Sequence, residues 1–353
     1  MTTSKKSMRQ LRLLVVDNFQ IRRYGAGREG HGYRYMCGAV RNNYRVMSFS
    51  ERDITRYLAP LGFMRNIGAN MMNKRFIKTC SNFRPDVVLI GHCDYLKNSS
   101  LEKVRKILPE VKLVHINVDP IWQDHTVGQI RERMYSCDAI FVTSAGEKLK
   151  EWTTGRNVVG FLPNVCDETM EYEDLSLKND YKYDLFFAGH HNQNDERVGL
   201  VQELEKRLVG KVRFGLFGMC GHESIAGAHY EDALISSAMA LSLNRREGVK
   251  WYSSDRMAHL MGRGIMTFIS AKSGFQDFFR DGEEAVFFDD ADDLAAKVIK
   301  YANDTSARRR IAAAGRARYH ELFNSARVLR YIVDTIYGEE SAGKYEWSSE
   351  VYK

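Results

Sequence analysis

The stretch WYSSDRMAHLMGRGIMTFIS, residues 251–270, predicts a helix followed directly by a buried strand. Ser253 and Ser254 are residue types that cap helix N-termini, and the free backbone N–H groups beside Arg256 would then form an anion site. Gly264 ends the predicted helix, and the apolar run IMTFI after it is typical of a strand buried on both faces of a parallel sheet. The alternative is an ordinary packed helix with a solvated arginine.

Polar and apolar side chains alternate along this segment at helical spacing. The polar stripe consists of Tyr252, Arg256, His259 and Arg263. Apolar residues lie beside it at Met257, Leu260 and Met261. One side of the helix can therefore pack while the other meets a charged ligand.

Short apolar runs alternate with helical patterns along most of the chain. In the first half these runs are 11–16, 44–49, 86–91, 112–117, 139–144 and 157–162. In the second half they are 183–189, 212–218, 239–243, 265–269 and 285–288. This rhythm predicts an α/β fold with two Rossmann-like units, each built on a parallel sheet with right-handed crossovers.

A chain of 353 residues is long enough for two domains. We expect an N-terminal Rossmann-like domain at 1–165, a polar and acidic linker at 166–182, and a second Rossmann-like domain at 183–325. Residues 326–353 are expected to form a C-terminal helix and a mobile tail, because their last part has no apolar period.

The composition, 44% hydrophobic and 27% charged, is that of a soluble globular protein, and no apolar run approaches membrane-spanning length. We therefore expect a cytoplasmic protein. The net charge of +7 admits three kinds of partner, namely nucleic acid, an anionic membrane surface and an anionic small molecule. It is also compatible with no functional role for the charge.

Ligands of open parallel sheets bind outside the carboxyl ends of the strands. Residues 188–204, AGHHNQNDERVGLVQEL, follow one such strand, with a turn at Gly189 and with Arg197 in the first turn of the next helix. We expect this loop, the loop at 218–222 and the helix start at 253–256 to converge on one anionic ligand.

Residues 183–325 resemble the C-terminal half of GT-B glycosyltransferases, and most closely the group 1-like subset that includes the spore-maturation-type proteins. The segments that carry the resemblance, in consistent order, are YDLFFAGHHNQNDERVGLVQEL, LFGMCG, SSDRMAHLMGRGIMTFI, GFQDFFRDGEEAVFFDDADDLAAKVI and ARRRIAAAGRARYHELFN. The resemblance implies the GT-B fold, in which two Rossmann-like domains face each other across a cleft and the C-terminal helices pack back toward the N-terminal domain. It also implies that this half holds a nucleotide-sugar donor as co-substrate, with no other cofactor.

The candidate donor-binding residues are those of the three converging segments, together with one carboxylate near the strand at 285–288. They are Gly189, His190, Arg197, Gly218, Tyr252, Ser254, Arg256, His259 and Glu284. One of them departs from the family pattern, because many related enzymes have a ribose-binding glutamate where this chain has His259. The D-x-D within residues 289–293 is expected to cap a helix, so we predict no essential metal.

Acceptor binding and a catalytic base are expected from the first domain. Asp119, which leaves a predicted strand just before a proline, is the first candidate for the base, followed by His92 and Asp94. An Asx-type turn that only shapes the loop is the alternative for Asp119. The glycine-rich loop at 17–34 offers acceptor-binding residues that could stack on sugars or hold an anion: Arg22, Arg23 and Tyr24.

The sequence thus predicts a metal-independent glycosyltransferase of polysaccharide biosynthesis that moves a sugar from a nucleotide-activated donor to a glycan, lipid-linked or protein acceptor. Peripheral contact with the inner face of an anionic membrane is expected as an option, and nucleic acid is not expected as a partner. The alternatives are a nucleotide-sugar epimerase with the same two-domain fold, and a non-catalytic basic protein that binds nucleic acid or a membrane.

Overall fold

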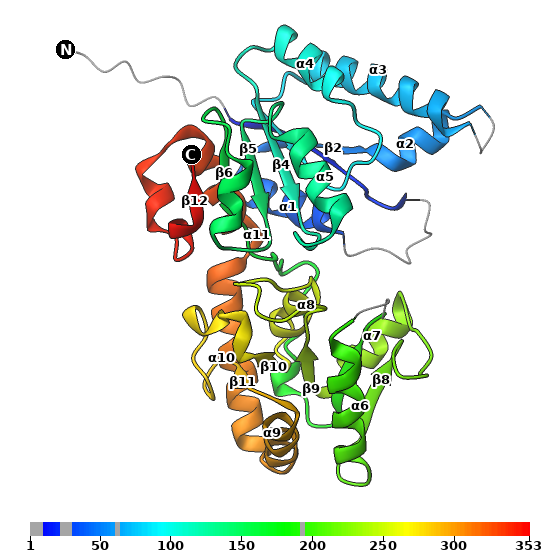
Figure 1. Cartoon of the computed structure of the whole chain (residues 1–353), viewed down its shortest axis with the longest axis vertical. Coiled ribbons are helices and arrows are strands. Elements are labelled where there is room, and N and C mark those ends of the chain that lie inside the picture. Colours follow the sequence, from blue (N-terminus) through cyan, green and yellow to red (C-terminus); the bar gives the residue numbers. More distant parts are fainter. Residues whose placement is uncertain (1–9, 22–29, 61–63, 191–194) are drawn as a thin grey trace. The chain divides into compact units, whose positions relative to one another are not determined.

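The computed structural model describes residues 10–21, 30–60, 64–190 and 195–353, and the chain divides into two compact units (Figure 1). Unit 1 comprises Met1–Val142, Glu147–Phe161 and Ser325–Lys353, and unit 2 comprises Thr143–Gly146 and Leu162–Asn324. Each apolar run named above overlaps a strand, and most of these strands are apolar almost throughout because they are buried on both faces of a parallel sheet, although the strand at 45–50 is largely exposed.

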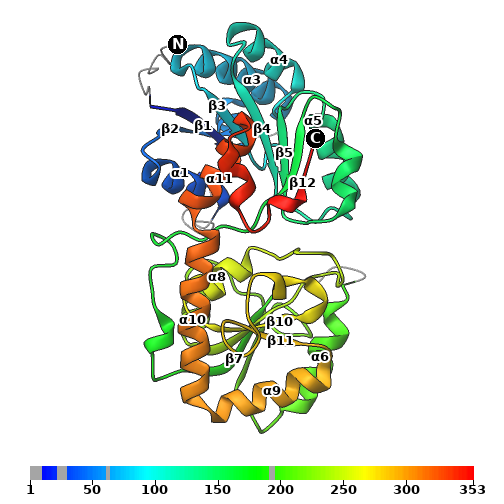
Figure 2. The ribbon, with the colours of Figure 1, turned by 90° about the vertical axis from the view of Figure 1, so that its left-hand side faces the viewer.

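Unit 1 is built on a seven-stranded sheet with the order β12-β6-β5-β4-β3-β1-β2 (Figure 2). Its strands are β1 (Arg12–Asp17), β2 (Arg45–Ser50), β3 (Val87–Ile90), β4 (Lys112–Asn117), β5 (Ala139–Val142), β6 (Val158–Phe161) and β12 (Val351–Tyr352). All neighbouring pairs are parallel except β12 and β6. The carboxyl ends of β1, β3 and β4 therefore meet at one edge of the sheet.

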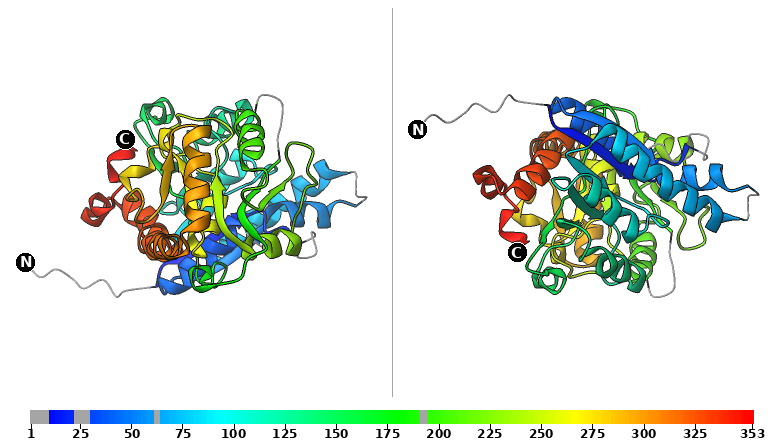
Figure 3. Two further views of the ribbon diagram at one scale, coloured as in Figure 1. Left: turned by 90° about the horizontal axis from the view of Figure 1, so that it is seen from below. Right: turned by 90° about the horizontal axis from the view of Figure 1, so that it is seen from above.

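Helices cover both faces of this sheet. They are α1 (His31–Arg41), α2 (Glu51–Leu58), α3 (Arg65–Phe83), α4 (Asn98–Ile107), α5 (Asp124–Arg133) and α11 (Ser325–Tyr337). Strand residues such as Val88 pack with α3 and α4 in one apolar cluster, whereas Phe141 meets Tyr331 of α11 on the other face. The hairpin of α2 and α3 projects beyond the edge of the sheet (Figure 1 and Figure 3).

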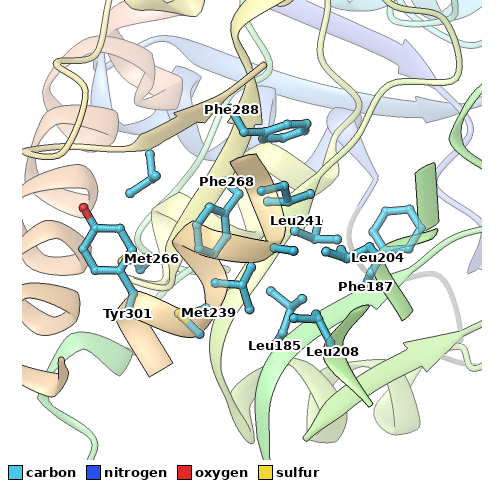
Figure 4. Packing of buried hydrophobic residues seen from close by; sticks show 14 of the residues in the cluster. Leu185, Phe187, Leu204, Leu208, Met239, Leu241, Met266, Phe268, Phe288 and Tyr301 are labelled. Atoms are coloured by element: carbon cyan, nitrogen blue, oxygen red, sulfur yellow. The ribbon is translucent and has the colours of Figure 1, made fainter. Parts of the chain in front are cut away.

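Unit 2 is built on a parallel five-stranded sheet with the order β11-β10-β9-β7-β8. Its strands are β7 (Tyr183–Ala188), β8 (Phe214–Phe217), β9 (Ser237–Ser242), β10 (Met266–Ser270) and β11 (Val286–Phe288). Its helices are α6 (Arg197–Leu208), α7 (Ala228–Ile235), α8 (Arg256–Gly262), α9 (Ala291–Asn303) and α10 (Thr305–Phe323). Alternate strand residues fill an apolar core with α6 and α9, in which Phe187, Met239 and Phe268 are almost completely buried (Figure 4).

The segment predicted as a linker, 166–182, packs within unit 2 instead. Leu175 belongs to an apolar cluster of that unit, and its backbone N–H donates to the Arg263 carbonyl at 2.8 Å. Glu171 is completely buried. The acidic composition of 166–182 suggested a solvated segment. The sequence of this segment does not reveal that its side chains contact α8.

Residues 338–353, predicted as a mobile tail, are instead folded onto unit 1. Trp347 is completely buried, with its ring 5.4 Å from that of Tyr331, and Arg327 lies over the Trp347 ring at 5.3 Å. Strand β12 then pairs antiparallel with β6. Two aromatic anchors and a two-residue strand hold this segment, and neither produces an apolar period in the sequence.

Candidate functional site

The start of α8 differs from the predicted anion site. The helix begins at Arg256, and neither serine caps it: the N-cap residue is Asp255, without a side-chain cap hydrogen bond. Ser253 Oγ instead accepts a hydrogen bond of 3.0 Å from Asn164. Because α8 has only seven residues, its N-terminus is not an anion site in its own right. The helix does end as predicted, with φ of +71° at Gly264.

The Arg256 side chain is held firmly from three sides. Its Nε donates to the Ala188 carbonyl at 3.1 Å, and its Nη1 donates to the Leu243 carbonyl at 3.1 Å and to Ser254 Oγ at 3.3 Å. The guanidinium lies 4.8 Å from the centre of the Phe187 ring. Burial lowers the pKa of Arg256 to about 10, and the nearby Arg197 charge also lowers it. Arg256 is therefore still cationic at neutral pH.

Arg197, the first residue of α6, is buried beside it. Its Nε donates to Asp195 Oδ1 at 2.8 Å, and its Nη2 donates to the His190 carbonyl at 2.8 Å and to Asp195 Oδ2 at 2.5 Å. Asp195 thus balances the charge of Arg197. No carboxylate among the described residues pairs with Arg256, so the two arginines together carry one unbalanced positive charge.

Both guanidinium groups converge on Gly189. A Cβ atom added at this glycine would lie 3.3 Å from Arg197 Nη1 and 3.4 Å from Arg256 Nη2. Within the described chain neither of these two nitrogens donates a hydrogen bond, so the N–H groups beside Gly189 are available to a ligand. Gly218 packs directly against the Gly189 backbone. A Cβ at Gly218 would lie 2.7 Å from the Gly189 carbonyl oxygen, and its φ of +70° also favours glycine. The arrangement can bind a phosphate or diphosphate.

His259 lies on the next turn of α8 and faces two carboxylates. Its Nδ1 is 3.4 Å from Glu171 Oε1, and its Nε2 is 3.3 Å from Asp255 Oδ2. Glu171 also accepts the backbone N–H of Asp167 at 2.8 Å. The departure from the family pattern thus has a physical reason, because a glutamate at 259 would face two like charges in a buried position.

The other candidates of unit 2 are dispersed. Tyr252 is buried, and its carbonyl accepts a hydrogen bond of 2.6 Å from Asn244. His190 contacts Ser224 Oγ at 3.3 Å, so it stays near the Gly189 turn. Glu284 is hydrogen-bonded to Arg280 through both of its oxygens. The Arg280 backbone N–H donates to Oε2 at 2.9 Å, and Arg280 Nη2 donates to Oε1 at 2.8 Å. Burial raises the pKa of Glu284, but these hydrogen bonds from Arg280 outweigh that effect and lower it.

Unit 1 has a polar cavity of about 370 Å³ at the carboxyl ends of β1 and β3. Its lining includes residues that the sequence analysis did not single out: Asp17, His31, Arg52, Asp53 and Arg56. Asp17 is nearly buried, and its Oδ1 accepts the backbone N–H groups of Asn18 at 2.6 Å and His92 at 3.1 Å. Gly91 makes room for the other oxygen, since a Cβ there would lie 2.5 Å from Asp17 Oδ2. In the sequence, Asp17 only marked the end of an apolar run.

The three candidates for the base lie together in unit 1. His92 lines the cavity, with its Nδ1 3.8 Å from Asp119 Oδ2 and its Nε2 4.0 Å from Asp94 Oδ1. Asp94 also pairs with Arg52 at 2.7 Å. The backbone N–H of Asp119 donates to Asn117 Oδ1 at 2.9 Å, which is an Asx turn as the alternative reading had it, although Asn117 supplies the oxygen.

The predicted acceptor-binding residues Arg22, Arg23 and Tyr24 lie outside the described residues. A further carboxylate, which the sequence gave no reason to notice, lies behind the cavity: Glu51 at the start of α2 is completely buried. Burial raises the pKa of Glu51 to about 7, although the backbone N–H of Tyr95 hydrogen-bonds to its carboxylate and opposes the shift. The lining of the cavity itself contains two carboxylates, Asp17 and Asp53, and two arginines, Arg52 and Arg56.

The described residues contain neither a metal-binding cluster nor a membrane-spanning helix. No three of their His, Cys, Asp or Glu side chains are grouped so that they could hold a metal ion. None of their helices has both the length and the apolar character needed to cross a bilayer.

Comparison with known proteins gives a family match for the C-terminal part of the chain. Residues 197–334, which include α6, α8 and both arginines, match a family model described as glycosyl transferase-like. No curated protein matches the chain. This part of the chain thus matches the glycosyl transferase-like family that the resemblance seen in the sequence indicated.

Similar solved structures give the fold. Sucrose-phosphate synthase from Thermosynechococcus elongatus matches with a TM-score of 0.58 at 12% identity, over 93% of this chain and 99% of the other. HepE from Anabaena, in complex with UDP and glucose, matches with a TM-score of 0.57 at 10% identity, over 93% and 100% of the two chains. A putative UDP-N-acetylglucosamine 2-epimerase from Listeria monocytogenes matches with a TM-score of 0.52 at 9% identity, over 95% and 97%. The predicted GT-B fold is therefore confirmed.

Proposed function

We propose that this GT-B glycosyltransferase moves a sugar from a nucleotide-activated donor held by unit 2 to an acceptor hydroxyl held by unit 1. The observation that carries the proposal is the convergence of Arg197 and Arg256 on Gly189, with one unbalanced positive charge and unused N–H groups. A diphosphate gains charge when the bond to its sugar breaks. Fixed cationic donors therefore stabilise the transition state more than the ground state.

The donor is proposed to be a nucleoside diphosphate sugar, in line with the UDP and glucose in the similar HepE structure. Its diphosphate would sit over Gly189 and receive hydrogen bonds from Arg197 Nη1 and Arg256 Nη2. The two arginines would take the place that a divalent cation has in metal-dependent transferases, so we propose that transfer does not require a metal. The acceptor is a hydroxyl of a glycan, a lipid-linked glycan or a protein.

The base is proposed to be His92, because among the three predicted candidates it is the one that lines the cavity of unit 1. Asp119 Oδ2 lies 3.8 Å from its Nδ1, a distance from which a small movement would make a hydrogen bond that orients the imidazole and leaves Nε2 free to accept the hydroxyl proton, while Asp94 is paired with Arg52. Asp17, held by two backbone N–H groups, would accept a hydrogen bond from a second acceptor hydroxyl.

Nucleotide binding and product analysis test the function. We expect one of UDP, GDP, CMP or dTDP to raise the melting temperature of the protein, since a ligand that binds only the folded state stabilises it. The matching nucleotide-sugar with an acceptor should release free nucleotide at a rate that EDTA does not change. If the sugar is instead altered while still attached to its nucleotide, with no nucleotide released, the protein acts as an epimerase and the proposal is wrong.

Replacement of the proposed base has a specific signature. His92→Gln should lower kcat by about 100-fold or more, because general base catalysis contributes at least that much, while the shift in melting temperature with nucleotide stays as in the wild type. Wild-type transfer by the His92→Gln variant would contradict the assignment.

A further inference from the structure

Helix α3 of unit 1 carries an exposed face that its own unit leaves unpartnered. The helix contains four basic residues and no acidic residue. Its buried residues, such as Met72 and Phe76, face α2 and α4, whereas the opposite side is exposed along much of the helix. We call this side the α3 face, which consists of Met64, Ile67, Met71, Lys74, Arg75 and Lys78.

The apolar and basic residues of the α3 face are segregated along the helix. Ile67 and Met71 are each 44% exposed and lie in the first two turns of the helix, which form the apolar tip of the α3 face. Lys74, Arg75 and Lys78 follow on the same arc, since residues three and four apart share one side of a helix. An exposed apolar tip with a cationic stretch behind it is an amphipathic arrangement.

The cations of the α3 face are all exposed. Within the part of the chain that the structure describes, neither Lys74, Arg75 nor Lys78 forms an ion pair. A partly exposed cation elsewhere in unit 1, Arg105, is paired with Asp138 at 2.9 Å. An anionic surface can therefore bind the α3 face without first breaking ion pairs of these three cations.

An apolar groove of about 620 Å³ continues the α3 face toward α2. Its lining is mostly apolar or aromatic, including Phe19, Ile54 and Tyr57, and Arg75 lies at it as well. Tyr57 is 80% exposed, an unusual degree for a ring on a helix that packs against its neighbour. The groove and the α3 face thus share Arg75.

From these observations we propose that the α3 face docks unit 1 onto a bilayer that contains anionic phospholipid. Ile67, Met71 and Tyr57 would enter the boundary between headgroups and acyl chains, and Lys74, Arg75 and Lys78 would bind lipid phosphates. Nucleic acid is a poorer match, since it would leave the apolar tip in water. The inference concerns unit 1 alone and does not require the transfer reaction, so either can fail without the other.

Vesicle flotation with the full chain tests this docking. We expect the protein to float with vesicles of phosphatidylcholine and 30% phosphatidylglycerol, and not with phosphatidylcholine alone. The triple change Lys74→Gln, Arg75→Gln and Lys78→Gln should lower the partition coefficient by about 100-fold, at about five-fold for each cation. A matched triple change of exposed lysines in unit 2, namely Lys206→Gln, Lys211→Gln and Lys300→Gln, alters the net charge equally and should have little effect.

The apolar contribution is tested by Ile67→Ser with Met71→Ser, which should lower binding to the anionic vesicles by about ten-fold or more. All variants should keep the wild-type melting temperature without any nucleotide, which shows that they fold. The proposal would be overturned if the triple change in unit 2 lowered vesicle binding as much as the triple change on the α3 face. Absence of the wild-type protein from the floated fraction would also overturn it. Tight binding to an RNA oligonucleotide that depends on Lys74, Arg75 and Lys78 but not on Ile67 and Met71 would overturn it in favour of nucleic acid.

Discussion

Replacement of Arg256 by alanine is expected to lower kcat/KM for sugar transfer by at least about 100-fold, the cost of removing one fixed donor to developing charge. The structural reason is specific, because Arg256 is the cation of the pair that no carboxylate of the described chain balances. Its removal takes away both the unbalanced charge and the free Nη2 beside Gly189. Steady-state kinetics with the nucleotide-sugar identified by thermal shift would measure the loss.

Arg308 provides a matched control for the stability cost of this change. It is also a buried arginine of unit 2, its Nη1 donates to the Tyr301 carbonyl at 3.2 Å, and its guanidinium lies 5.6 Å from the centre of the Tyr181 ring. Arg308→Ala should therefore destabilise unit 2 by an amount similar to that of Arg256→Ala, yet leave kcat/KM close to the wild-type value. If both variants lose transfer to the same extent, Arg256 acts through folding and the donor site is placed wrongly.

His259→Glu is expected to destabilise the protein by about 3 kcal/mol or more, although it introduces the residue that many related enzymes have at this position. The new carboxylate would lie between Glu171, which is completely buried, and Asp255, where the imidazole now contacts an oxygen of each. Like charges in a buried position raise one another's pKa and weaken folding at neutral pH. Urea unfolding followed by fluorescence would give the difference in unfolding free energy.

Two further variants separate charge from shape. His259→Gln, which is uncharged, should cost less than His259→Glu. The double variant His259→Glu with Glu171→Gln should recover part of the loss, because one of the two opposing carboxylates becomes neutral. A His259→Glu variant as stable as the wild type would mean that Glu171 moves away easily, and the proposed explanation of the departure would be wrong.

The sheets could be predicted from the sequence almost completely. Helices cover both sides of a parallel sheet, so most positions of strands such as β7 and β10 are buried. The runs that contain these strands are therefore apolar on both faces. The segment at 166–182 could not be placed in the same way. Glu171 is buried because His259, which lies 88 positions away, offers it a partner, and no local pattern reports such a pair.

The candidate site was predictable in part. The sequence identified Arg197 and Arg256 from their loop and helix positions, and the family resemblance connected them. For Arg256 the predicted reason was wrong, because α8 has no serine cap. The site depends instead on the two arginine side chains that meet beside Gly189. Asp17 was overlooked because an acid at the end of an apolar run is indistinguishable, in sequence, from one that simply ends a strand.

The return of residues 325–353 to unit 1 has a consequence for how the chain is assembled during synthesis. Unit 2 is almost continuous in sequence, from Leu162 to Asn324, and can close as soon as those residues have left the ribosome. Unit 1 is begun earlier but completed later, because the edge of β6 and the partners of Trp347 wait for the segment that follows. During translation the first unit must therefore remain unfinished, with an open strand edge, for the time taken to make the whole of the second.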